Sequence, residues 1–196
     1  MAERITRANG EASRRRILDA AAEIAGERGY AGTSISDVSK RSGLPKSSIY
    51  WHFSDKDALF AAVIEDSYER WLEEFNIRVS ARDLTPQELV VLLHDSLADF
   101  PAFLRFGHLV ILERHDTELS ARAKFLDIRR RSLQNMSAMF ERTTGIDAPA
   151  AASLAAVALA LVDGAFLARA ADEHTLADST ALAEVLEAFV DRTRTT

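Results

Sequence analysis

The sequence predicts an all-α protein of about nine helices. Apolar residues recur at three- and four-residue spacing along most of the 196 residues, which is the period of an α-helix. Helix start and stop signals separate these stretches. No stretch alternates apolar and polar residues in the way that a half-buried strand does. The chain is therefore expected to consist of helices joined by short connections.

The first predicted helix runs from Ser13 to Arg28 and is closed by Gly29. Two short helices joined by a tight turn are predicted next. The first starts at Ser34, because Ser34 and Asp37 have the spacing of a capping box, and it ends at Gly43. The second covers residues 45–51, with proline tolerated in its first turn.

The outward positions of this second short helix suit a DNA major groove. Lys46, Ser47 and Ser48 offer one cation and two hydroxyls, which can bind base edges or phosphates. Tyr50 and Trp51 add large side chains that a plain surface helix rarely displays. The alternative is a solvated surface turn of an ordinary helical protein. The pattern favours a helix-turn-helix within a three-helix DNA-binding head.

Further helices are predicted down to the carboxyl end. Ser54 and Asp57 are spaced to cap a long helix of residues 55–80. Thr85 and Glu88 form a second capping-box signal, and Pro101 breaks the helix that follows. The remaining helices are expected at residues 103–115, 118–142, 148–171 and 179–192, with a stop and restart at residues 145–147.

Composition bounds the function. The net charge is −6, but residues 1–58 carry 10 basic and 8 acidic residues, so the positive charge lies in the amino-terminal part and in the basic run Arg14-Arg15-Arg16. There is no cysteine, so thiolate and disulfide chemistry is excluded. The most apolar run, residues 148–162, is shorter than the about 20 residues of a membrane span. We expect a cytoplasmic protein without a membrane segment, cofactor or metal. No motif of a known catalytic site is present, so an enzyme is not expected.

Residues 13–60 resemble the amino-terminal region of the TetR family of bacterial transcriptional regulators. The matching positions are Gly29-Tyr30, Thr33-Ser34, Val38, Gly43-Leu44, Ile49-Tyr50, His52-Phe53, Lys56 and Leu59. Ser39 and Ser42 depart from the pattern, since alanine is usual at both positions. The resemblance implies a DNA-binding domain at residues 1–58 and a larger helical ligand-binding and dimerisation domain at residues 59–196.

The resemblance also implies roles for individual residues. Side chains expected to contact phosphates are Ser34, Tyr50, His52 and Lys56. Side chains expected at or near bases are Ser36, Lys46, Ser47, Ser48 and Trp51. A dimer of such heads would read a palindromic operator in double-stranded DNA, with half-sites about one helical turn apart.

The two last helices are predicted to form a homodimer interface. The helix of residues 148–171 is apolar on nearly all sides, so it must be covered on nearly all sides. The alternative is an interior helix of a monomer. The resemblance implies a four-helix bundle with the symmetry mate. Expected interface residues are Leu154, Val157, Leu161, Ala165, Ala168, Val185 and Phe189.

The resemblance further implies that a small effector binds the second domain and releases the protein, as a repressor, from DNA. Aromatic and methionine side chains there favour an apolar or aromatic effector. The candidate lining is Trp71, Phe75, Phe100, Phe103, Phe106, His108, Met136, Met139 and Phe140. The same residues at helical spacing also fit a plain apolar core. His108 and His115 are about 10 Å apart along one helix, too far to share a metal ion. Two alternatives remain: a ligand-independent DNA-binding protein, or a helical scaffold, controlled by a protein partner.

Overall fold

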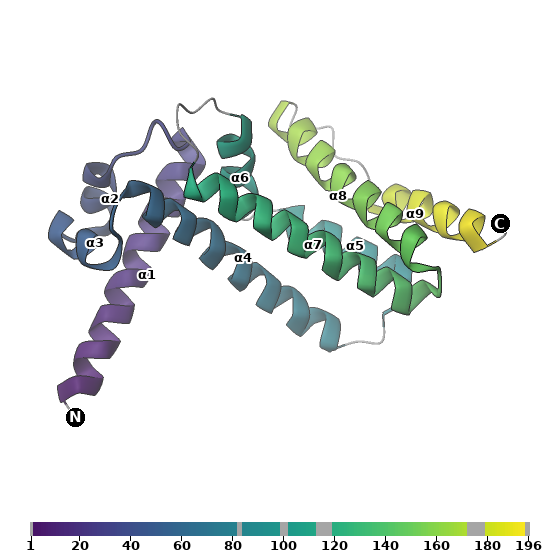
Figure 1. The fold of residues 1–196 in the computed structure, drawn as a ribbon, viewed down its shortest axis with the longest axis horizontal. Helices are drawn as coiled ribbons and strands as arrows, with labels where there is room; N and C mark the ends of the chain where they lie inside the picture. Colours follow the sequence, from purple (N-terminus) through teal and green to yellow (C-terminus); the bar gives the residue numbers. More distant parts are fainter. Residues whose placement is uncertain (1, 82–83, 99–101, 113–118, 172–178, 195–196) are drawn as a thin grey trace. The chain divides into compact units, whose positions relative to one another are not determined.

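The computed structural model describes residues 2–81, 84–98, 102–112, 119–171 and 179–194, and these residues form nine helices and no strand (Figure 1). The all-α prediction is confirmed. The helices are α1 (Ala2–Arg28), α2 (Ile35–Ser42), α3 (Lys46–His52), α4 (Lys56–Ser80), α5 (Pro86–Ala98), α6 (Ala102–Leu112), α7 (Ser120–Thr144), α8 (Ala148–Ala171) and α9 (Ser179–Arg194).

Close contacts divide the chain into two compact units. The first unit contains residues 1–70 and 101–127, and the second contains residues 71–100 and 128–196. Each unit therefore takes part of α4 and part of α7. This grouping concerns packing alone. The functional division, with a DNA-binding domain at residues 1–58 and a ligand-binding and dimerisation domain at residues 59–196, stays a prediction.

In the first unit, α1, α2 and α3 pack around a common apolar core with the start of α4. Its fully buried members include Ile17, Val38, Ile49 and Leu59. The predicted signals of α2 are present: the Ser34 hydroxyl accepts a bond from the Asp37 N–H, and the Asp37 carboxylate accepts one from the Ser34 N–H. Gly43 ends α2 with φ of 67°, a left-handed conformation that glycine adopts without strain.

The start of α1 was predicted too late. The helix begins at Ala2 instead of Ser13. Ser13 does not act as a cap, because its hydroxyl donates to the carbonyl of Asn9, one turn earlier in the same helix, at 2.8 Å. A serine that bonds back into its own helix leaves no signal in the sequence that separates it from a capping serine.

The cap of α4 was also predicted incorrectly. Asp55, not Ser54, accepts the bond from the Ala58 N–H at 2.8 Å, while the Ser54 hydroxyl donates to Asp55. Asp57 instead accepts bonds from the N–H groups of Ser120 and Ala121 at the start of α7. The sequence offered two carboxylates at capping distance from the helix start, and the contact with α7 decides between them.

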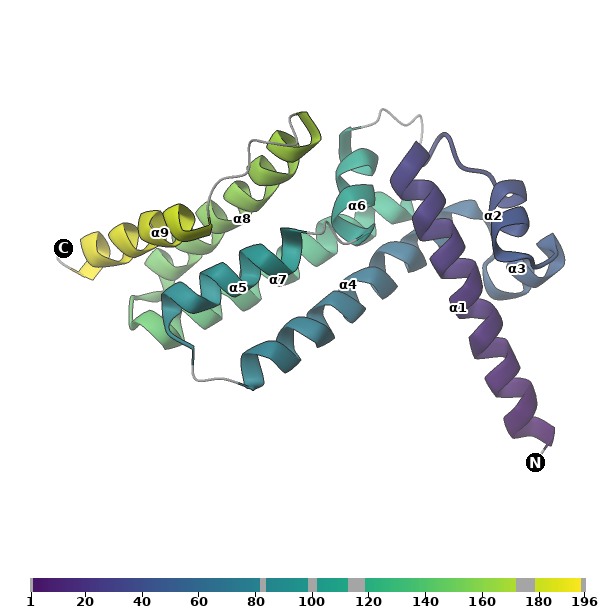
Figure 2. The same ribbon diagram turned by 180° about the vertical axis from the view of Figure 1, so that it is seen from behind.

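Helices α5, α8 and α9 pack together in the second unit with the later part of α7 (Figure 2). The predicted capping box of α5 is present: the Thr85 N–H donates to Glu88, and the Glu88 N–H donates to the Thr85 hydroxyl. Gly145, with φ of 71°, ends α7, and Asp147 caps α8 by accepting the Ala150 N–H. Residues 113–118, where one helix was predicted to end and the next to begin, lie outside the described residues.

Helix α8 contains an apolar window that passes a length and composition test for a membrane span. The window is Ala148–Ala165, and 22% of it is buried within the chain. The core helix of a soluble protein passes the same test, so the window is weak evidence for a membrane protein. The residues of this window are partly buried by the described part of the chain and partly exposed.

Candidate nucleic-acid interface

Helix α3 presents one buried and one exposed face. Ile49 is fully buried and fixes the helix to the head. On the other side Lys46 and Ser47 are exposed, and the side chains of Tyr50 and Trp51 are 53% and 76% exposed. Two large aromatic side chains this exposed on a seven-residue helix form a surface suited to binding a partner.

Helix α1 supplies a second wall beside this face. An open hollow of about 410 Å³ lies between the two helices, lined by Asn9, Gly10 and Ser13 from α1 and by Ser47, Ser48, Trp51 and His52 from α3. A side chain added at Gly10 would begin 3.8 Å from the Trp51 ring, so α1 passes directly beside the indole. Sequence reasoning missed the α1 residues, because it began that helix at Ser13.

The other predicted contact residues lie around the same head. Ser34 is exposed at the start of α2, and Ser36, two residues later, is half-buried. The ammonium of Lys56 lies 4.0 Å from the centre of the Tyr30 ring, a cation–π contact that holds it at the start of α4. Burial, followed by the nearby charge of Asp57, raises the pKa of Tyr30, so the phenol is neutral.

The three consecutive arginines of α1 have separate structural roles. The guanidinium of Arg14 lies 5.6 Å from the centre of the Phe53 ring. Arg15 pairs with Asp66 of α4 at 2.8 Å, and Arg16 donates to the carbonyl of Ser42 at 2.6 Å. A cation at the last carbonyls of α2 is favoured by the helix dipole. Arg15 and Arg16 thus hold the head together through contacts with α4 and α2.

The turn between α2 and α3 explains the two serines that depart from the family pattern. The hydroxyl of Ser39 donates to the carbonyl of Leu44 at 2.7 Å. The hydroxyl of Ser42 accepts a bond from the N–H of Leu44 and donates to the carbonyl of Ser39. Alanine at these positions would leave these backbone groups to other partners. The serines therefore tie the turn that positions α3.

His52 is the titratable group nearest the hollow. Its pKa is lowered from the ordinary value of 6.5, first by burial and then by the positive charge of Arg14. The imidazole is therefore neutral at pH 7. Its ring makes an edge contact with Trp51, with centroids 4.5 Å apart.

The residues predicted to line an effector pocket fall into both compact units. Phe103, Phe106 and His108 are buried in the first unit. Trp71 stacks on Phe75 in the second unit. Met136, Met139 and Phe140 belong to or pack against the apolar cluster there. Phe100 lies outside the described residues. An effector role for these residues stays a prediction.

The residues predicted at a dimer interface differ in exposure. Leu154 is 1% exposed and packs in the core of its own chain. Val157, Leu161 and Val185 are exposed, and Val185 is 58% exposed. Ala165, Ala168 and Phe189 are half-buried. The exposed members are the ones available to a second copy.

Comparison with known proteins places this head in a family. Residues 17–63, from α1 to the first turns of α4, match the family model of bacterial regulatory proteins, tetR family. This region of the chain is therefore similar to the amino-terminal region of TetR-family regulators. The matched segment contains the whole of α2 and α3 and the turn between them.

Two curated relatives match about a third of this chain. The HTH-type transcriptional regulator AcrR of Shigella flexneri is 36% identical over 62 residues, 32% of this chain and 29% of that protein. IcaR of Staphylococcus epidermidis, named as a negative transcriptional regulator of a biofilm operon, is 29% identical over 58 residues, 30% of this chain and 31% of its own length. These two matches thus span about three-tenths of the relatives' own length.

Solved structures extend the TetR-family likeness to the fold of nearly the whole chain. The transcriptional regulator FadR from Bacillus subtilis, solved in complex with stearoyl-CoA, aligns with a TM-score of 0.66 over 89% of this chain and 96% of its own. Sequence identity is 20%, so this likeness concerns the fold alone.

Proposed function

We propose that this chain is a TetR-like transcriptional repressor that binds a palindromic operator as a homodimer and is released by a small apolar or aromatic effector. The observation that carries the proposal is the exposed face of α3. Ile49 anchors the buried side of this helix, and the exposed side carries Lys46, Ser47, Tyr50 and Trp51. As a DNA-binding regulator it acts in the cytoplasm.

On this proposal α3 enters the major groove, where lysine and serine side chains reach base edges. The phosphates are bound by Ser34, Tyr50, His52 and Lys56, at the edges of the same head. The α1 residues Asn9 and Ser13 join them, because they line the hollow that α3 borders. Their polar groups are suited to a sugar–phosphate strand.

Two observations support a homodimer. Among the described residues, 22% of the apolar window of α8 is buried and Val157 and Leu161 are exposed, and α9 exposes Val185 in the same unit. A second copy related by a two-fold axis would cover both helices with the same surface, as isologous interfaces do. Two heads then bind two half-sites, which makes the operator a palindrome.

Release by an effector is supported by the residue types of the second unit and by one relative. Aromatic and methionine side chains suit apolar or planar ligands. FadR of Bacillus subtilis was solved with stearoyl-CoA, a small molecule, in the same overall fold. IcaR, which is similar over 58 residues, is named as a negative regulator, which supports repression.

The alternative function is a ligand-independent DNA-binding or scaffold protein controlled by a protein partner. A thermal-shift screen of apolar and aromatic compounds separates the two, because a ligand that binds only the folded state raises the unfolding temperature. Stabilisation by one compound class, with loss of DNA binding at the same concentration, supports effector control. Stabilisation without any change in DNA binding favours the alternative.

The decisive test is selection of random duplex DNA on the full-length protein at a stated salt concentration. We expect enrichment of a palindrome with half-sites about one helical turn apart. Salt-sensitive binding without any enriched sequence would contradict operator recognition, since non-specific binding is carried by phosphate contacts alone.

Acidification is expected to strengthen operator binding through His52. A lowered pKa means that the free head disfavours the imidazolium, so the folded state loses stability as pH falls through 6.5. A phosphate beside His52 favours the charged form, so DNA binding takes up a proton. Affinity should rise between pH 7.5 and 5.5, by at most about tenfold per pH unit per head. Fluorescence anisotropy with the selected duplex, at a series of pH values, measures this change in affinity. His52→Gln should abolish the dependence; an equal dependence in that variant contradicts the phosphate contact.

A charge on the uncovered face of α8 is expected to prevent dimer formation. Leu161→Glu would place a carboxylate in an apolar interface, where desolvation disfavours it strongly. We expect a monomer by sedimentation velocity at micromolar concentration, and loss of palindrome-specific binding. Leu126→Glu is the matched control, because Leu126 on α7 is similarly exposed but lies outside the predicted interface. A Leu161→Glu protein that sediments as a dimer would contradict this interface.

A further inference from the structure

Helix α7 is capped by a residue from another helix. Asp57 lies in the first turn of α4, and its carboxylate oxygens accept the N–H groups of Ser120 at 2.8 Å and Ala121 at 3.2 Å. The residue that precedes α7 is Leu119, whose side chain has no acceptor. The first N–H groups of a helix need such acceptors, and a negative charge there is favoured by the helix dipole. A carboxylate 63 residues away in sequence thus does what a local cap usually does.

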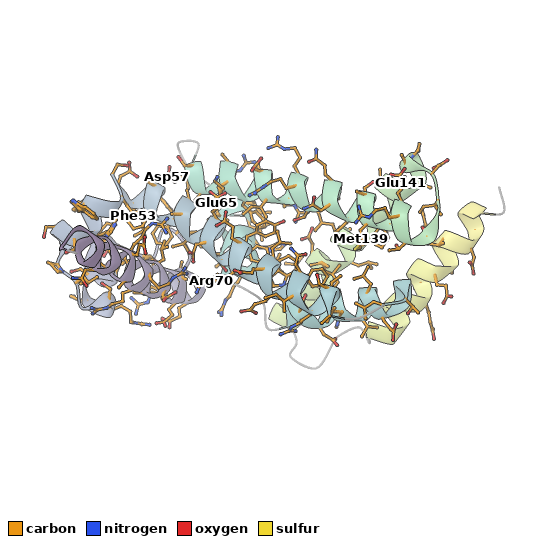
Figure 3. The ribbon with its side chains drawn as sticks, turned by 90° about the horizontal axis from the view of Figure 1, so that it is seen from below. Phe53, Asp57, Glu65, Arg70, Met139 and Glu141 are labelled. Atoms are coloured by element: carbon orange, nitrogen blue, oxygen red, sulfur yellow. The ribbon has the colours of Figure 1, made fainter. Side chains whose placement is uncertain are left out.

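Other contacts hold the start of α7 in the same place within the first unit. The ammonium of Lys124 pairs with Glu65 of α4 at 2.6 Å, and Figure 3 labels Asp57 and Glu65 along α4. Phe125 packs so closely on α6 that a side chain at Gly107 would overlap its ring. The hydrogen bonds that Asp57 accepts are therefore part of a closely packed junction between α4, α6 and α7.

Asp57 also has a second set of possible partners. Ser54 and Asp57 have the spacing of a capping box, in which Asp57 would bond the Ser54 N–H at the start of α4. That box is not formed, because Asp55 caps α4 through the Ala58 N–H at 2.8 Å. In this structure both carboxylate oxygens of Asp57 accept bonds from α7. A second arrangement, with Asp57 bonded to the Ser54 N–H instead, would give the junction the two states that a switch requires.

We propose that Asp57 is a positioning residue that couples α7 to α3, the helix proposed to enter the major groove. Bonded to α7, it fixes the start of α4 and, four residues earlier, Phe53 at the end of α3. That arrangement favours operator binding. Released from α7, it closes the Ser54 box and loosens the junction. Because α7 continues to Thr144 in the second unit, an effector that displaces α7 would act through these two bonds. This role rests on the proposed function.

The first test needs no DNA and no effector. Hydrogen–deuterium exchange of the full chain reports the amides of the first turn of α7. Asp57→Ala should accelerate exchange of Ser120 and Ala121 by about tenfold or more, since each loses a bond to a charged acceptor. Ser120→Pro removes one donor without touching Asp57, and proline is tolerated in a first helical turn. Asp37→Ala, which removes a cap carboxylate of α2, is the control. Unchanged exchange at Ala121 in both test variants would overturn the proposal.

The second test addresses the competition between the two partners. Asp55→Ala removes the present cap of α4 and should draw Asp57 back to the Ser54 N–H. Exchange of Ser120 and Ala121 should then accelerate, although Asp55 bonds neither residue. A merely structural Asp57 would leave these amides protected in the Asp55→Ala protein, and that result would overturn the switch.

The third test uses the reciprocity of coupled equilibria: if the bonds between Asp57 and α7 favour operator binding, operator binding must favour those bonds. The selected operator duplex should slow exchange at Ala121 in the unmodified chain but not in Asp57→Ala, whose operator affinity should fall by about tenfold. Asp57→Asn retains an acceptor oxygen and should recover part of that affinity. Operator binding without any change at Ala121 would overturn the positioning role and leave the proposed function intact. If no duplex is selected, the proposed function fails and the positioning role fails with it, while the DNA-free exchange still decides whether Asp57 caps α7.

Discussion

Alanine at Lys46 or Tyr50 is expected to cause the largest loss of operator binding. A base contact such as that predicted for Lys46 is worth about 1–3 kcal/mol and a dimer carries two heads, so its loss should lower affinity roughly 30- to 20,000-fold. Loss of the phosphate contact predicted for Tyr50 should lower affinity in the same direction. The reason is the position of both side chains on the exposed face of α3, with Ile49 anchoring the opposite face. Anisotropy titrations with the selected duplex, at two or more salt concentrations, measure the loss.

The salt dependence separates the kinds of contact. If Lys46 binds a phosphate, its removal weakens all sequences alike and reduces the salt slope by about one per head. If it binds a base, discrimination at one position of each half-site is lost. Lys40→Ala is the matched control, since Lys40 is exposed on α2 and lies outside the predicted contacts. Full operator affinity in Lys46→Ala and Tyr50→Ala would contradict α3 as the recognition helix.

Gly107→Ala is expected to cause the largest loss of stability. A Cβ at Gly107 would overlap the ring of Phe125 on α7, so one helix must move. Overpacking of this kind costs about 1–3 kcal/mol, which for a chain of this size lowers the unfolding temperature by several degrees. Calorimetry of the purified protein measures the shift.

Two further variants define the cause of that loss. Gly26→Ala, also inside a helix, would place its Cβ 3.7 Å from the flexible Arg105 side chain, and it should stabilise the protein by up to about 1 kcal/mol. Phe125→Leu in the Gly107→Ala background makes room for the new methyl group and should recover part of the stability. A Gly107→Ala protein as stable as the parent would show that the α6–α7 contact is looser than described.

Local signals predicted most of the fold correctly. Capping boxes such as Ser34–Asp37 and Thr85–Glu88 place acceptors within four residues of the donors that they satisfy, so sequence spacing alone identifies them. The exposed face of α3 was predictable for the same reason, since helical period separates Ile49 from its neighbours. The contact roles of these residues remain predictions.

The features that sequence reasoning missed depend on contacts between distant segments. Asp57 is at a good local capping position, and only the packing of α7 shows why it is used elsewhere. Arg15 lies in the run Arg14-Arg15-Arg16 and Arg129 in the run Arg129-Arg130-Arg131. Arg15 nevertheless pairs with Asp66, and Arg129 pairs with Asp163 through two bonds at 2.8 and 2.6 Å. Charge spacing along one helix carries no information about the helix that packs against it.

The placement of the two tryptophans gives the protein a built-in optical reporter for each compact unit. Trp51 is the solvent-exposed indole of the proposed DNA interface, so its emission should be red-shifted and quenched by a bound duplex. Trp71 donates to the carbonyl of Ser96 and stacks on Phe75, so its emission should be bluer. Since the chain has two tryptophans in all, one Trp-to-Phe replacement isolates either signal. Stopped-flow fluorescence can then time an event in one unit against an event in the other, without an attached dye.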